Sequence, residues 1–145
     1  MRGYWIFNIG TAEFAPPADW LDAWRHHTAE MWFPPNKRPS GVRAGDRAVI
    51  NGTGRTGFIA VVEVVSSAPE ENASPKQEDR ERWPYLLRYR LLLAIRADIH
   101  APSLEDVGWD NPKRLRRQPH VRIDEQLYER ISRAIVEGAR EAVAA

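Results

Sequence analysis

The hexapeptide at residues 52–57 has the residue types and spacing of a phosphate-binding loop. It reads Gly-Thr-Gly-Arg-Thr-Gly, and the G-x-G-x-x-G pattern binds pyrophosphate when a helix begins directly after its last glycine. In this chain the last glycine is followed by the apolar, β-branched run Phe58–Val65, which is typical of a buried strand. The sequence therefore predicts a hairpin between two strands, and we expect Gly52, Gly54 and Gly57 to supply the positive φ angles of its tight loop.

Three other groups of residues are suited to nucleic acid. Asn8 lies in an apolar stretch, where it either binds backbone at a strand end or reads the edge of a base. Trp32 and Phe33 stand beside two prolines, and this rigid pair either stacks on a base or anchors a loop by burial. The segment Lys113–Arg122 is rich in arginine, whose guanidinium binds phosphate bidentately, although an arginine excess can also reflect a GC-rich genome.

Residues for acid–base catalysis are present, but no catalytic motif organises them. A nuclease or hydrolase would draw on Asp46, Glu63, His100 and His120. The chain has no serine nucleophile elbow, no H-E-x-x-H and no carboxylate cluster at metal spacing. It has no cysteine, and the adjacent His26 and His27 would point to different sides of a helix. We therefore expect no enzyme activity, no cofactor and no metal site, with a hydrolase as the weaker alternative.

Length and composition indicate one domain that spans residues 1–145. Apolar residues make up 43% of the chain and charged residues 28%, and the net charge of +1 creates no field that would select nucleic acid. No apolar run approaches the ~18 residues of a membrane span, and the first residues do not read as a signal peptide. The absence of cysteine fits a reducing compartment, so we expect a cytoplasmic protein.

Hydrophobic patterning predicts the strands that position these residues. Strands are expected at Gly3–Ile9, on both sides of the glycine loop, and at Trp83–Ala97. Alternation along the last of these strands places on one face Tyr85, Leu87, Tyr89, Leu91, Leu93 and Ile95. Four or five strands are therefore expected.

Helical patterning and capping residues predict three helices. The first is Ala18–Trp32, because Trp20, Trp24, His27 and Met31 follow helical spacing. The second is a short helix in Pro102–Trp109, capped by Ser103, and the third is Asp124–Ala144, capped by Asp124. The segment Ser67–Arg82 is expected to be a mobile polar loop. Strands and helices in mixed order predict an α+β domain on a curved sheet or small barrel.

Taken in order along the chain, these landmarks resemble the EVE domain, a PUA-like fold related to the YTH domains. The matching segments are Tyr4–Asn8, Trp32–Pro34, Gly45–Ile50, Gly57–Val65, Tyr85–Ile95 and Leu104–Trp109. The resemblance covers nearly the whole chain and implies a curved, barrel-like mixed sheet with flanking helices. It also implies a pocket for a modified base of DNA or RNA, which would serve sensing, regulation or defence and not catalysis.

The resemblance assigns roles to particular residues. The base pocket would be lined by Asn8, Trp32, Phe33, Pro34, Asn51, Gly52 and Thr53. Within it, Trp32 and Phe33 would form the stacking wall. The nucleic-acid backbone would be held by Arg114, Arg116, Arg117, His120 and Arg122. Asn51 stands where the family often has tyrosine, so one wall of the pocket differs from the family pattern.

Two other functions stay open. A general RNA-binding module of the PUA type would share the fold and the basic segment, but it would show little preference among modified bases. A homodimeric interaction protein would use its exposed aromatic residues as the interface. Binding assays separate the first alternative from a base reader, and a measurement of molecular mass tests the second.

Overall fold

The computed structural model describes residues 2–9, 29–52, 57–94, 102–103, 105–108 and 120–144. Within these residues, seven strands form one mixed sheet and two helices flank it. The strands are β1 (Tyr4–Ile9), β2 (Ala29–Phe33), β3 (Arg47–Gly52), β4 (Gly57–Val64), β5 (Glu70–Glu71), β6 (Tyr85–Ala94) and β7 (His120–Ile123). The helices are α2 (Gln77–Arg82) and α3 (Glu125–Ala144). The α+β fold predicted from the sequence is therefore confirmed, with more strands than the four or five expected.

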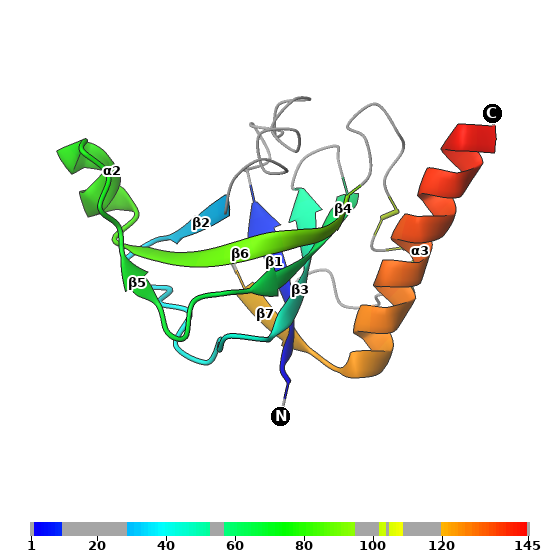
Figure 1. The fold of residues 1–145 in the computed structure, drawn as a ribbon, viewed down its shortest axis with the longest axis horizontal. Coiled ribbons are helices and arrows are strands. Elements are labelled where there is room, and N and C mark those ends of the chain that lie inside the picture. The colour runs from blue at the N-terminus through cyan, green and yellow to red at the C-terminus, as the bar shows by residue number, and fades with distance from the viewer. Residues whose placement is uncertain are drawn as a thin grey trace.

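The strand order along the sheet is β2-β6-β4-β3-β1-β7, and β5 pairs with the start of β6. β1 and β3 run parallel, whereas the other pairings are antiparallel. Figure 1 shows the long strand β6 arching across the sheet. This arch gives the sheet the form of a curled half-barrel.

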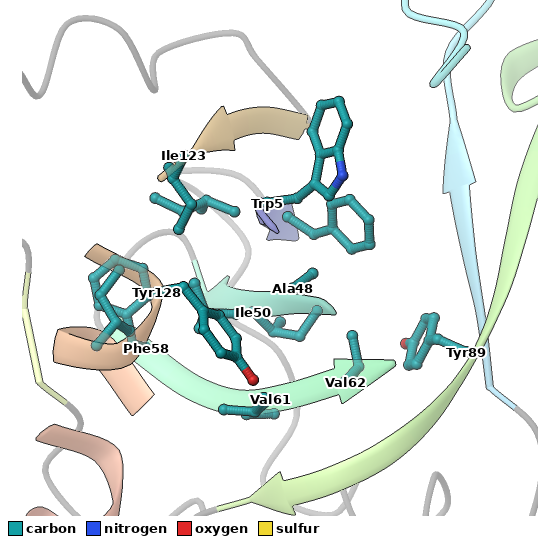
Figure 2. Close-up of a cluster of buried hydrophobic side chains, with 14 of the residues drawn as sticks. Trp5, Ala48, Ile50, Phe58, Val61, Val62, Tyr89, Ile123 and Tyr128 are labelled. Carbon is teal, nitrogen blue, oxygen red and sulfur yellow. The ribbon is translucent and has the colours of Figure 1, made fainter. Parts of the chain in front are cut away.

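The curl brings the two edge strands together. Phe33 of β2 lies with its ring centroid 5.6 Å from His120 of β7 and 6.0 Å from Phe7 of β1. We call the sheet face that carries these rings the inner face and the opposite one the outer face. Figure 2 shows Tyr89 of β6 pointing toward Val62 and the neighbouring strands, where it is fully buried.

Helix α3 covers the outer face beside β1, β3 and β4 (Figure 1). Its N-cap is Asp124, whose Oδ1 accepts a 2.7 Å hydrogen bond from the Leu127 N–H. Its buried stripe includes Ile131 and Ile135, as the spacing predicted. The ring of Tyr128 meets that of Tyr4 at 4.7 Å, which fixes the outer face of β1 against the helix.

The predicted helix Ala18–Trp32 is wrong at its C-terminal end. Residues 29–33 form β2, whereas residues 18–28, including Trp20, Trp24 and His27, lie outside the described residues. Met31 and Phe33 are buried and Trp32 is only half-buried, so burial follows the period of two that a strand imposes. Met31 fitted the predicted helical stripe because a single buried residue is compatible with the period of a helix and with that of a strand.

The predicted mobile loop Ser67–Arg82 is also wrong, because it contains β5 and α2. Polar side chains order this segment. Asn72 is buried, and its amide donates to the Trp83 carbonyl at 2.7 Å and accepts from the Ser74 N–H at 3.0 Å. The Ser74 hydroxyl in turn bonds the Asp79 carboxylate at 2.8 Å. A segment without large apolar residues is thus held by partly buried hydrogen bonds, which composition alone does not reveal.

The glycine hairpin is confirmed, since β3 and β4 pair antiparallel and Gly52 lies opposite Gly57. Gly57 has the expected positive φ of 72°, whereas Gly52 is an ordinary strand residue, and Gly54 lies outside the described residues. The register between β4 and β6 also shifts between Val61 and Val62. Leu92 of β6 is an additional residue at this bulge and has no register partner on β4. The shift moves Leu93 off the face that strict alternation predicted.

The short helix predicted in Pro102–Trp109 is a single turn at residues 105–108. Ser103 and Asp106 cap it reciprocally. The Asp106 N–H donates to the Ser103 hydroxyl at 3.2 Å, and the Ser103 N–H donates to the Asp106 carboxylate at 2.8 Å. The turn ends at Gly108, whose φ is 74°, as its position after the cap suggested.

Candidate nucleic-acid interface

Asn8 and Asn51, two of the predicted base-pocket residues, lie side by side. They are partners in the parallel pairing of β1 and β3, and the Asn51 amide donates to Asn8 Oδ1 at 2.9 Å. Both are half-buried, and the buried Gly52 follows directly. The structure therefore brings together the predicted polar part of the pocket, while Thr53 lies outside the described residues.

Trp32 and Phe33 do not form one wall. They are consecutive residues of β2, so their side chains point to opposite faces of the sheet. Phe33 is fully buried on the inner face, where it meets Phe7. Trp32 is half-buried on the outer face, and its indole N–H donates to the Glu30 carboxylate at 3.2 Å.

The amide pair does not share a surface with Trp32 either. Phe7 and Phe33 point toward each other across the inner face, so the residues next to them, Asn8 and Trp32, point away from each other. Pro34 is half-buried and follows β2 directly. The pocket predicted from the sequence therefore divides into an aromatic part and an amide part on different sides of the barrel.

Two of the predicted backbone-binding residues, His120 and Arg122, lie on β7 around Trp5. The Arg122 guanidinium stands 5.8 Å from the centroid of the Trp5 ring, and the His120 ring lies 5.9 Å from it. Arg122 is exposed and His120 is half-buried. The other predicted cations of this group, Arg114, Arg116 and Arg117, lie outside the described residues.

His120 occupies a crowded position between β1 and β2. Its ring contacts both Trp5 and Phe33, and its Nδ1 is buried with no hydrogen-bond partner among the described residues. Burial, together with the positive charge of Lys37, lowers the pKa of His120 below its ordinary value of 6.5. Lys37 belongs to the connection between β2 and β3, so this loop lies beside β7.

The loop at residues 34–45 is a basic segment to which the sequence analysis assigned no role. It carries Lys37, Arg38 and Arg43 and no acidic residue. Arg38 stands 5.7 Å from the centroid of the Tyr85 ring. Gly41 lies against Trp5, because a Cβ at this position would be 3.2 Å from Trp5 Cη2. A basic loop leading into a strand was visible in the sequence, but its proximity to β7 was not.

Asp46 ties the loop to the barrel. This carboxylate is only 4% exposed and accepts three hydrogen bonds: from the Gly3 N–H at 2.8 Å, the Trp5 indole N–H at 3.0 Å and the Arg43 N–H at 3.0 Å. Gly3 is needed at this point, since a Cβ there would lie 2.9 Å from Asp46 Oδ2. The carboxylate thus joins β1, the Trp5 ring and the basic loop.

The carboxylates considered for catalysis have structural partners. Asp46 is buried in the bonds just described, and Glu63 pairs with Arg90 at 2.9 Å and with Arg47 at 3.8 Å. His100 lies outside the described residues. The described part of the chain contains no group of three or more residues able to hold a metal ion. Nor does any helix in that part have the length and apolarity to cross a membrane.

Comparison with known proteins identifies the fold. No family model matches the sequence, and no curated protein matches it. Solved structures similar to this chain include the following three. Protein Atu2648 from Agrobacterium tumefaciens has a TM-score of 0.59 and 13% identity, over 91% of this chain and 92% of that one. A hypothetical protein from Leishmania major has a TM-score of 0.63 and 17% identity, over 94% and 96% of the two chains. Rpa0253 from Rhodopseudomonas palustris has a TM-score of 0.62 and 11% identity, over 93% and 94%.

The likeness is one of fold. It extends over nearly the whole length of each chain, so the half-barrel with its flanking helices is a recurrent structure. The identities of 11–17% carry no functional residue from those proteins to this one.

Proposed function

We propose that this protein binds nucleic acid and holds the phosphodiester backbone on the surface that β7 presents over the buried Trp5 ring. The observation that carries the proposal is the position of Arg122, which is exposed and stands 5.8 Å over the Trp5 ring. An aromatic face attracts a guanidinium and limits its freedom, so less entropy is lost when the guanidinium binds phosphate.

The sequence before β7 strengthens the proposal. Residues 113–117 contain four basic side chains, and the chain from there runs into the strand that holds His120 and Arg122. Four cations placed in the sequence just before the strand of Arg122 are the composition expected of a polyanion-binding segment, even though the net charge of the whole chain is only +1. The resemblance to the EVE domain supports the same class of partner.

A second proposed function is the recognition of a base, modified or not, at the amide pair. Asn8 and Asn51 are half-buried and linked at 2.9 Å, and asparagine amides carry both the donors and the acceptors that match base edges. Asn8 follows Phe7, which is the register partner of His120, so the amide pair lies on the opposite face of β1 from His120 and Arg122. We therefore treat backbone binding and base reading as separable activities with separate tests.

The test of backbone binding is a titration with fluorescein-labelled single-stranded DNA and RNA oligonucleotides at several salt concentrations. The Arg122→Gln variant is expected to weaken binding of all sequences alike and to reduce the slope of log K against log salt by about 0.7–1. The matched control is Arg133→Gln, which removes an exposed arginine from α3. Equal slopes for the two variants, or no binding by the wild-type protein, would contradict the proposal.

A further inference from the structure

The loop at residues 34–45 lies next to the surface that β7 presents over the buried Trp5 ring. Lys37 is close enough to His120 for its charge to act on the imidazole, and Gly41 packs against Trp5. Arg122 stands over the same ring. Two basic segments that are far apart in the sequence therefore meet around one tryptophan.

The loop presents its cations outward. Arg38 and Arg43 are exposed, and Lys37 is half-buried. Arg38 lies over Tyr85 at 5.7 Å, as Arg122 lies over Trp5. The acidic residue that follows the loop, Asp46, is buried and faces three N–H donors. The exposed part of the loop is therefore positive without a competing carboxylate of its own.

The loop is also held in one conformation. Its backbone closes three turns, through the N–H groups of Lys37, Ser40 and Val42 at 2.8–3.2 Å from the carbonyl groups of earlier loop residues. Val42 is fully buried and anchors the centre of the loop. The Arg43 guanidinium donates to the Ser40 carbonyl at 2.8 Å. A surface fixed in this way loses little conformational entropy when it binds a partner.

We propose that the loop Lys37–Arg43 is the second half of the nucleic-acid surface and grips the phosphodiester backbone next to the stretch held by β7. This inference rests on the proposed function, because it extends the same surface across His120 and Trp5. The partner is a polyanion with regularly repeated phosphates. The loop and β7, which meet at the rings of Trp5 and His120, can hold consecutive phosphates of such a chain. Asp46 is the positioning residue of this half of the surface, since it fixes the loop and contacts no phosphate itself.

The test removes the three cations of the loop together, in a Lys37→Gln, Arg38→Gln, Arg43→Gln variant. Each phosphate contact with a single strand contributes about 0.7 to the slope of log K against log salt concentration. The loss of three contacts is therefore expected to reduce this slope by about 2. The matched control is Lys76→Gln, Arg80→Gln, Arg82→Gln, which removes three exposed cations in and beside α2. The control is expected to keep the wild-type slope.

The outcomes separate this inference from the proposed function. If the wild-type protein binds no oligonucleotide, the proposed function fails and the inference fails with it. If Arg122→Gln weakens binding but the loop variant and the α2 control behave alike, only the inference is overturned. A fall in slope in both the Arg122→Gln variant and the loop variant, with the α2 control unchanged, supports both.

The role of Asp46 has a readout that needs no nucleic acid. Asp46→Asn places an amide N–H₂ against N–H donors, so the loop is expected to detach while α3 stays folded. Trypsin is then expected to cleave after Arg43 at least tenfold faster than in the wild-type protein. Unchanged cleavage with a normal circular dichroism spectrum would overturn the positioning role. If this variant does not fold, Gly3→Ala, whose Cβ would displace the Asp46 carboxylate, gives the same test with the charge retained.

Discussion

Phe33 and His120 lie on the two edge strands of the sheet, and their rings meet edge to face at 5.6 Å. The described strand pairings include none between β2 and β7, so side chains and not ladder hydrogen bonds close the curl at this point. Phe33 also meets Phe7, and His120 also meets Trp5. The shape of the half-barrel, and with it the position of β7, therefore depends on a small group of rings.

Truncating Phe33 is expected to destabilise the fold strongly. Phe33→Ala removes a fully buried ring and leaves a cavity between β1, β2 and β7, which typically costs about 3–5 kcal/mol. Urea denaturation followed by circular dichroism measures the change. The control is Val65→Ala, whose side chain is 49% exposed and whose loss is expected to cost no more than about 0.5 kcal/mol. A loss below about 1 kcal/mol for Phe33→Ala would show that the ring does not hold the curl.

His120 is expected to make stability depend on pH. Because burial and the Lys37 charge lower its pKa in the folded protein, the unfolded chain binds a proton first as the pH falls. The stability contributed by neutral His120 is therefore complete above about pH 6.5 and is lost as the pH falls through the lower, folded pKa.

The measurement for this effect is urea denaturation at pH 7.5 and at about pH 5. The three other histidines are common to the wild-type protein and a His120→Gln variant, so the difference between the two proteins isolates His120. The wild-type protein is expected to lose more stability on acidification than the variant. The same loss in both proteins would mean that His120 keeps an ordinary pKa.

The amide pair is expected to show coupling and to affect base preference. The Asn8→Ala and Asn51→Ala variants and their double variant form a thermodynamic cycle, with an expected coupling of about 0.5–1.5 kcal/mol. In a panel of oligonucleotides with modified and unmodified bases, Asn51→Ala is expected to reduce any preference among bases while leaving the salt slope unchanged. A slope that fell together with the preference would place the amide pair on the phosphate surface.

Elements defined by local signals were predictable from the sequence. The hairpin followed from glycines between two apolar runs, and α3 followed from Asp124 as a cap and from the spacing of Ile131 and Ile135. Each of these signals lies within a few residues of the element it specifies.

Features that depend on distant segments could not be read from the sequence. β7 has only four residues, and its alternation is hidden in a run of cations. Asp46 looked like a possible acid–base residue, because nothing local shows that its donors come from Gly3, Trp5 and Arg43. Parallel pairing of β1 and β3 sets Asn8 beside Asn51, whereas Trp32 and Phe33 lie on opposite faces because β2 is a strand.

A substitution at Trp32 distinguishes two proposals: the aromatic pocket predicted from the sequence, and the phosphate-binding surface on β7. Its indole donates to Glu30 on the outer face of β2, and its neighbour Phe33 occupies the inner face. We therefore expect Trp32→Ala to bind oligonucleotides with an affinity within about twofold of wild type, at every salt concentration. Titration of intrinsic tryptophan fluorescence measures this, because five of the six tryptophans remain as reporters. The contrary outcome is a variant that folds but loses a base-dependent fluorescence change shown by the wild-type protein. That result would mean that Trp32 stacks on the base, as the pocket predicted from the sequence requires.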